Sequence, residues 1–323
     1  DSTQGWINTM DSTSNVRGAV PFVVATGGNA IVTCGNFKTH IFTGPGTFCV
    51  SDVSGTGNPN VADYFVTAGG GGAGRSYGGG GGAGGFRMSN QHSLPAPETS
   101  PLANPTGITV TASAYPITVG AGGAGAPAPG NTGSNGANSI FSSITSAGGG
   151  FSGGYNDKTG GPGGSGGGGS FGPGGGSGGT GNSPPVSPPQ GNSGGVGSPG
   201  NNAQGGGGGA AASGGTGGPV NNQPGPGGIG SYIANGFVGP TAPTYGETGP
   251  VTPTRYFAGG GGGGSDAQQP GDTGGIGGGG SQRPCSPAAD KAGGINMGGG
   301  AGGIPAGGEI GGSGIVMIRY KFQ

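Results

Sequence analysis

Glycine falls on every third position between Gly160 and Gly181, without a miss. A repeat of three residues per turn is that of a left-handed helix of the polyglycine II type, which makes no internal hydrogen bonds. Its backbone N–H and C=O groups must therefore bond to neighbouring chains. Glycine on the inward faces lets those chains approach closely, so the pattern predicts a bundle of packed polyglycine II helices.

The composition limits what else the chain can form. Glycine contributes 96 of the 323 residues, whereas hydrophobic residues make up 28% and charged residues 7%, both below the usual shares of a globular domain. A large apolar core is therefore excluded. Disorder is the main alternative, because glycine-rich chains without a period are usually flexible linkers. The β-rich segments at both ends and in the middle of the chain favour a folded structure.

Those β-rich segments alternate with the glycine tracts. Residues 1–67 are predicted to form a β-rich N-terminal part, and residues 68–314 a polyglycine II bundle with variable loops and interspersed strands at 107–119 and 139–145. Residues 315–323 are predicted to be a closing strand that packs with the N-terminal sheet. The predicted fold class is mainly β plus irregular structure: a jelly-roll-like β-sandwich with an inserted polyglycine bundle and essentially no α-helix.

Charge and hydropathy exclude two classes of partner. The formal net charge is −1, and the ten basic residues are scattered, so nothing predicts binding to nucleic acid or to an anionic membrane surface. The apolar run from Gly314 to Tyr320 is too short to span a bilayer, so membrane insertion is not expected.

Few residues could carry chemistry. Cys34, Cys49 and Cys285 include no CxxC pair, so neither a zinc site nor a disulfide framework is expected; Cys34 and Cys49 are either bridged across a hairpin or small buried apolar residues. His40 is expected on the surface of a strand, and His92 lies in a polar loop where it could contact a ligand. No base is placed to activate a nucleophile. The chain is therefore predicted to be no enzyme and to hold no cofactor or metal.

Aromatic residues in the loops are more informative. They stand among glycine, proline, asparagine and serine, where little core exists to bury them. Aromatic rings on constrained loops are good anchors for a partner protein or for the face of a sugar. The alternative is that each ring merely caps the end of the bundle. The residues concerned are Tyr77, Phe86, Tyr155, Tyr232, Phe237 and Tyr245.

The chain resembles the glycine-rich domains near the C-termini of bacteriophage tail-fibre and other virion proteins, particularly those of marine cyanophages. It is also similar in design to polyglycine II tail-fibre adhesins of T-even-like phages, and more distantly to the glycine-rich ectodomain of anaplastic-lymphoma-type receptor kinases. The segments that carry the first resemblance are Gly5 to Ile7, Asp11 to Gly18, Thr26 to Gly28, Phe37 to Phe48, Asp63 to Gly70, Ile117 to Gly123 and Gly311 to Tyr320.

The resemblance implies an extracellular virion adhesin that displays variable loops on a rigid scaffold. Its expected partners are a bacterial surface receptor, either a glycan or an outer-membrane protein, and other subunits of the virion or tail fibre. Tail fibres are usually trimeric, so the resemblance includes a homotrimer among the expected assemblies. A purely structural fibre component that acts as a stiff spacer is the main alternative, and an ice-binding protein is a remote one.

The longest connection in the second half of the chain, Ser231 to Thr254, is the predicted contact loop. Its prolines reduce the entropy lost on binding. We expect it to form the receptor-contact tip together with two residues from neighbouring connections. The predicted receptor-binding residues are Tyr155, Tyr232, Phe237, Tyr245 and Arg283.

Overall fold

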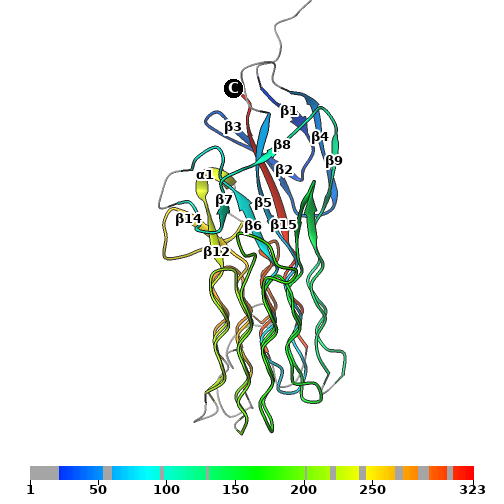
Figure 1. Cartoon of the computed structure of the whole chain (residues 1–323), viewed down its shortest axis with the longest axis vertical. Helices are drawn as coiled ribbons and strands as arrows, with labels where there is room; N and C mark the ends of the chain where they lie inside the picture. The colour runs from blue at the N-terminus through cyan, green and yellow to red at the C-terminus, as the bar shows by residue number, and fades with distance from the viewer. Residues whose placement is uncertain are drawn as a thin grey trace, which may run out of the picture.

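The computed structural model has two parts, a group of β-sheets and a long bundle of extended tracts that runs away from them (Figure 1). Within the described residues the fold is mainly β with one short helix, which confirms the predicted fold class. None of the described helices is long and apolar enough to cross a membrane. The structure describes residues 22–53, 60–94, 98–128, 131–200, 202–218, 223–239, 245–265, 272–282, 291–303 and 308–323.

The strands of the described residues form three sheets. The five-stranded sheet has the order β1-β4-β9-β10-β11, the seven-stranded sheet the order β2-β3-β15-β5-β6-β7 with β8 paired to β5, and the three-stranded sheet the order β12-β14-β13. The bounds are β1 Val24–Thr26, β2 Ala30–Cys34, β3 Phe37–Phe42, β4 Gly46–Asp52, β5 Val61–Thr67, β6 Phe86–Ser89, β7 Ala103–Asn104, β8 Ile108–Thr109, β9 Ala114–Thr118, β10 Ser139–Phe141, β11 Ile144–Ser146, β12 Ser231–Ala234, α1 Asn235–Val238, β13 Glu247–Thr248, β14 Thr254–Phe257 and β15 Ile315–Lys321.

The closing strand β15 lies in the middle of the seven-stranded sheet. It pairs antiparallel with β3 on one side and with β5 on the other. Successive side chains of a strand point to opposite faces, and both faces of β5 are buried throughout. Tyr64 and Tyr320 pack with Phe48 and Phe141 in the core between the two large sheets. This core is the interior of the sandwich.

The opposite face of the seven-stranded sheet carries the second core. Phe65 and Met317 of the large sheet pack there with Ile233, Phe237 and Phe257, which come from the three-stranded sheet and α1. The ring centroids of Phe65 and Phe257 are 4.8 Å apart. The small sheet therefore covers the large one, and burial of apolar area on both faces stabilises this end of the molecule.

The tract 78–85 runs through the middle of the bundle and makes its bonds to other tracts. Its N–H groups donate to three tracts in turn, and the order repeats after three residues. The acceptors of residues 79 to 84 are, in order, the carbonyls of Gly153, Gly205, Ala301, Gly150, Gly208 and Gly298, at 2.7–3.3 Å. A three-residue repeat of bonds to neighbours, with none inside the helix, is the geometry of polyglycine II.

The central tract is surrounded by six others. Three accept its N–H groups, namely 147–154, 203–210 and 298–303; three donate to its carbonyls, namely 68–75, 164–170 and 258–264. A Cβ added to a glycine of this tract would overlap backbone atoms of a neighbour, as at Gly80 and Gly81. Glycine is thus required here by the close approach of the tracts.

Outer tracts carry side chains at every third position, on the side that faces solvent. Glycine occupies most positions where a tract meets its neighbours, and small residues such as Ala83 and Ser165 occupy a few others. Examples of exposed residues three apart are Ala121 and Ala124, Thr159 and Pro162, Ser177 and Thr180, and Ser193 and Val196. The solvent-facing side chains therefore mark the outer lateral surface of the bundle, where no further tract packs among the described residues.

The run from Gly160 to Gly181 is not a single helix. It folds into parts of three antiparallel tracts, 158–163, 164–170 and 176–181, with turns between them. Gly174 and Gly175 adopt positive φ values of 85° and 66° at one turn. Glycine fits both a close-packed tract and a turn with positive φ. The three-residue period therefore continues through the turn, and the sequence period alone does not locate it.

Some smaller expectations are wrong. Cys34 and Cys49 lie in different sheets as free cysteines, and Cys34 is partly exposed and Cys49 exposed, so they are neither bridged across a hairpin nor small buried residues. His40 is fully buried inside the sandwich, where its ring nitrogens lie 2.7 Å from the Gly27 carbonyl and 3.0 Å from the Tyr320 hydroxyl. The polar partners on both sides make a buried histidine tolerable. The predicted strand at 107–119 is two strands, β8 and β9, separated by an irregular segment.

Candidate functional site

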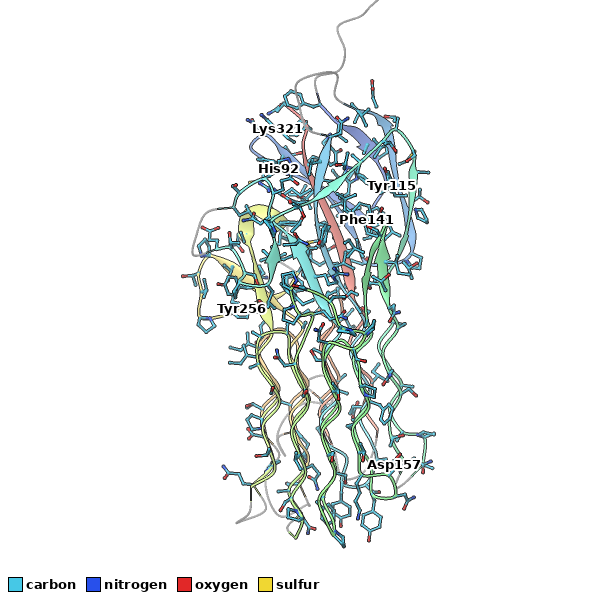
Figure 2. All side chains as sticks on the ribbon, viewed as in Figure 1. His92, Tyr115, Phe141, Asp157, Tyr256 and Lys321 are labelled. Atoms are coloured by element: carbon cyan, nitrogen blue, oxygen red, sulfur yellow. The ribbon has the colours of Figure 1, made fainter. Side chains whose placement is uncertain are left out.

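The end of the bundle away from the sheets presents a set of turns. Figure 2 shows Asp157 at this end, whereas His92 and Lys321 lie among the sheets at the other. The Gly154 N–H donates to the Asp157 carbonyl at 2.7 Å and closes the turn that contains Tyr155. Tyr155 therefore lies at the free end of the bundle.

Three aromatic rings from three different connections meet at this end. Tyr77 and Phe171 are in edge contact, with their ring centroids 4.8 Å apart. Tyr155 lies 6.0 Å from Tyr77 and 6.1 Å from Phe171. The Tyr155 side chain is 53% exposed, and the other two are half-buried. We call Tyr77, Tyr155 and Phe171 the tip cluster.

The bundle holds Tyr77 in an unusual backbone conformation. Ser76 and Tyr77 have positive φ values of 58° and 65°, a region that non-glycine residues rarely adopt and that costs on the order of 1–3 kcal/mol each. The Ser170 hydroxyl donates to the Tyr77 carbonyl at 2.7 Å, and the Ser152 hydroxyl accepts from the Gly74 N–H at 2.6 Å. Side chains of two neighbouring tracts thus fix the turn that aims the Tyr77 ring.

Charged and polar groups flank the tip cluster. The end of the Lys158 side chain lies over Gly172, 2.7 Å from where a Cβ would sit. Asp157 is exposed in the adjacent turn, and the Arg75 guanidinium donates to the Pro127 carbonyl at 3.4 Å. Aromatic faces beside groups that can donate and accept hydrogen bonds suit a ligand with both apolar and polar surfaces.

The structure separates the predicted receptor-binding residues. Tyr155 is at the free end. Tyr232 is in β12, Phe237 is in α1, and Tyr245 lies just before β13. These elements cover the large sheet at the other end of the molecule (Figure 1). Arg283 lies outside the described residues. The prediction that these residues form one tip is therefore wrong.

Phe237 is the clearest correction. Its ring is fully buried in the core between the small and large sheets, and its backbone carbonyl accepts from the Thr39 hydroxyl at 2.9 Å. Tyr245 packs against the same core, and Tyr232 is half-buried, 5.3 Å from the ring of Tyr256. These residues lie at the sheet end because the preceding tract, 223–230, runs toward the sheets, so the loop that follows it begins there.

Sequence reasoning did not single out Phe171. It lies in the middle of the strict glycine period, and the turn chemistry of Gly172, Pro173 and Gly174 directly follows it. An aromatic residue next to such a turn inside a glycine tract is a signal that could have located it.

A polar cluster lies elsewhere, at the sheet end. The buried carboxylate of Asp63 accepts from the Ser89 hydroxyl at 2.8 Å and from the backbone N–H groups of Gln91 and His92, and it lies 3.0 Å from His92 Nδ1. Burial alone would raise the pKa of Asp63, but the hydrogen bonds from His92 and Ser89 and from the backbone outweigh it and lower the pKa.

Arg319 completes this cluster. Its guanidinium lies 3.7 Å from the centre of the Phe37 ring and 3.5 Å from the Asp63 carboxylate, and burial lowers its pKa. The groups join strands β3, β5 and β15 to the segment after β6. Among the described residues no group of three or more His, Cys, Asp or Glu side chains could hold a metal ion.

Comparison with known families gives one match. A family model described as a glycine-rich domain matches residues 43–321, which include all of the described bundle and most of the strands. The chain belongs to this glycine-rich domain family. No curated protein matches the chain.

Proposed function

We propose that this glycine-rich domain is a non-enzymatic host-attachment module of a phage tail fibre, and that its tip cluster contacts a receptor on the bacterial surface. The observation that carries the proposal is the position of the tip cluster: three rings from separate turns, one of them half exposed, gather at the end of the bundle that is farthest from the sheets. The resemblance to virion proteins supplies the context.

The scaffold suits this role physically. The tracts are cross-linked by hydrogen bonds on all sides of the central tract, so the turns they carry lose little further entropy on binding. Aromatic residues supply large, rigid contact area and dominate many binding interfaces. The sheet end is then available for contacts with other fibre subunits. These subunits include further copies of this chain if it forms a homotrimer.

A cell-binding assay tests the proposal. The purified protein with Tyr155→Ala should bind host cells at least tenfold more weakly than the wild type, with a melting temperature within a few degrees, since this ring is 53% exposed. Tyr232→Ala, a half-buried tyrosine at the sheet end, is the matched control and should bind normally.

The stiff-spacer alternative makes the opposite prediction. If the tip variant and the wild type adsorb equally, the tip cluster is a cap of the bundle, and the chain is then a structural component rather than an adhesin.

A further inference from the structure

Arg319 is a buried cation whose hydrogen-bond donors are not satisfied. The residue is 4% exposed, and within the described part of the chain neither its Nε nor its Nη1 has a hydrogen-bond partner. A guanidinium carries five N–H donors and no acceptor. Buried charged donors are costly to leave unpaired. They therefore point to an acceptor that the described residues do not supply.

Asp63 is the nearest acidic group, but its oxygens are already occupied. Oδ1 accepts from the Ser89 hydroxyl and the Gln91 N–H, both at 2.8 Å, and Oδ2 accepts from the His92 N–H and lies 3.0 Å from His92 Nδ1. An ionised carboxylate has about four lone-pair sites, so these four contacts fill it. Arg319 Nη1 lies 3.5 Å from Oδ2 without a hydrogen bond. The ion pair thus balances the charge of the guanidinium and leaves its donors unmet.

Strand β15 brings Arg319 to the rim of the second core. Met317, Arg319 and Lys321 lie on one face of the strand, since alternate residues share a face. Met317 is fully buried beneath the small sheet, Arg319 is 4% exposed, and Lys321 is exposed. The guanidinium therefore lies directly below the surface, where the small sheet stops covering the large one.

The neighbouring groups leave one edge of the guanidinium for a ligand. The centre of the Phe37 ring lies 3.7 Å from the guanidinium carbon and covers one face, and the Phe237 ring centre lies 5.9 Å away. Nη1 faces Asp63, whereas the Nε–H of the planar group points to the edge away from Nη1. A planar group with two oxygens can accept two parallel N–H bonds from such an edge.

We propose that this edge of Arg319 is a binding site for one carboxylate group, with the ammonium of Lys321 on the same face of the strand. The charges fit a single negative charge, because Arg319 and Asp63 cancel and Lys321 leaves one positive charge. Burial lowers the pKa of Arg319, and the charges of Asp63 and Cys34 oppose this; a bound carboxylate acts in the same sense as these two groups. Both a small free acid and an acidic side chain of another subunit carry the required group.

A titration of the wild-type protein with sodium acetate tests the proposal without a substitution. Acetate replaces chloride at constant pH and ionic strength, and the Arg319 Nε–H signal is followed in nitrogen-15 NMR spectra. The signal should move downfield and saturate, because this donor gains a charge-assisted hydrogen bond. Sodium chloride alone should not move it. The proposal is wrong if acetate leaves the signal in place or if chloride moves it equally.

Matched variants provide the second measurement. Acetate should raise the melting temperature of the wild type, since a ligand that binds only the folded state stabilises it. Arg319→Lys keeps the charge but loses the planar fork, so it should bind acetate at least tenfold more weakly. Arg87→Lys, at a partly exposed arginine of β6 in the same sheet, is the control and should respond as the wild type does. Equal responses of the two variants to acetate would overturn the proposal.

Two short capped peptides identify the source of the carboxylate. If an acidic side chain of another subunit occupies the site, Gly-Glu-Gly should move the Arg319 signal at a lower concentration than acetate does. If the ligand is a small free acid, acetate should act at the lower concentration. Gly-Gln-Gly lacks the charge and should have no effect. An equal shift with the glutamine peptide would mean that the site does not recognise a carboxylate.

Discussion

Gly166 lies directly against the carbonyl of Gly179 in the adjacent tract, so close that a Cβ on Gly166 would overlap the carbonyl carbon and oxygen. Its own N–H donates to the Asn192 carbonyl at 3.0 Å, and its carbonyl accepts from the Gly208 N–H at 2.9 Å. One glycine thus touches three neighbouring tracts.

Gly166→Val should therefore destabilise the protein severely. The side chain would push the tracts apart and leave several backbone groups unpaired, at about 1–3 kcal/mol each. Thermal unfolding should show a fall in melting temperature well beyond that of Thr180→Val, whose side chain is exposed on an outer tract.

Ser165 lies beside the glycine period, which suggests an outward position like that of Thr180, but the same substitution would not be tolerated there. It is fully buried, its hydroxyl finds no partner, and its N–H bonds to the Ala83 carbonyl. Equal melting temperatures for the Gly166 and Thr180 variants would contradict the packed bundle.

The three-residue glycine period predicted the bundle because most inner positions, such as Gly166, leave no room for a Cβ, and only small residues such as Ala83 and Ser165 replace glycine there. The sandwich followed from β-rich segments such as 37–42, whose residues do pair in a sheet. Turns were harder to predict, because glycine fits both a tract and a turn. Around Gly172 the glycine period continues unbroken, and only Phe171 and Pro173 mark the place where the chain reverses.

The candidate site was predicted only in part, and the reason is the direction of the tracts. Which end a loop reaches depends on the number of reversals before it, and one hidden turn changes that assignment for every later loop. Tyr155 follows few reversals, and its loop lies at the free end of the bundle. Phe237 follows many, and its loop arrives at the sheets instead.

Phe237→Ala should lower stability rather than affect binding directly. Deleting a fully buried phenylalanine leaves a cavity and costs about 3–5 kcal/mol. Tyr155→Ala, which removes a 53% exposed ring, should leave the free energy of unfolding nearly unchanged. Chemical denaturation of the two variants checks the contrast, and a Phe237 variant as stable as the wild type would mean that the second core is not packed as described.

His40 should make the protein less stable as the pH falls below 6.5. Burial, aided by the charge of Lys38, lowers the pKa of His40 from its ordinary value of 6.5, although the bond to the Gly27 carbonyl partly opposes this. Above that value the imidazole is neutral in both states, and stability is at its full level. Below it the unfolded chain takes up a proton that the folded protein resists, so stability falls. His40→Gln should show a flatter dependence of melting temperature on pH between 6.5 and about 5.

Asp63 should add a second loss of stability at more acidic pH. Its pKa is lowered from 3.8 in the folded protein, because the bonds from His92, Ser89 and the backbone outweigh burial. The carboxylate therefore contributes its full stability above 3.8, and this contribution disappears as the pH falls from 3.8 through the lower folded pKa. Asp63→Ala, which leaves the buried Arg319 without its carboxylate, should cost about 3–5 kcal/mol at neutral pH and remove this acid-dependent step. Denaturant titrations at several pH values measure both effects; a variant that keeps the same acid-dependent step would assign it to other carboxylates.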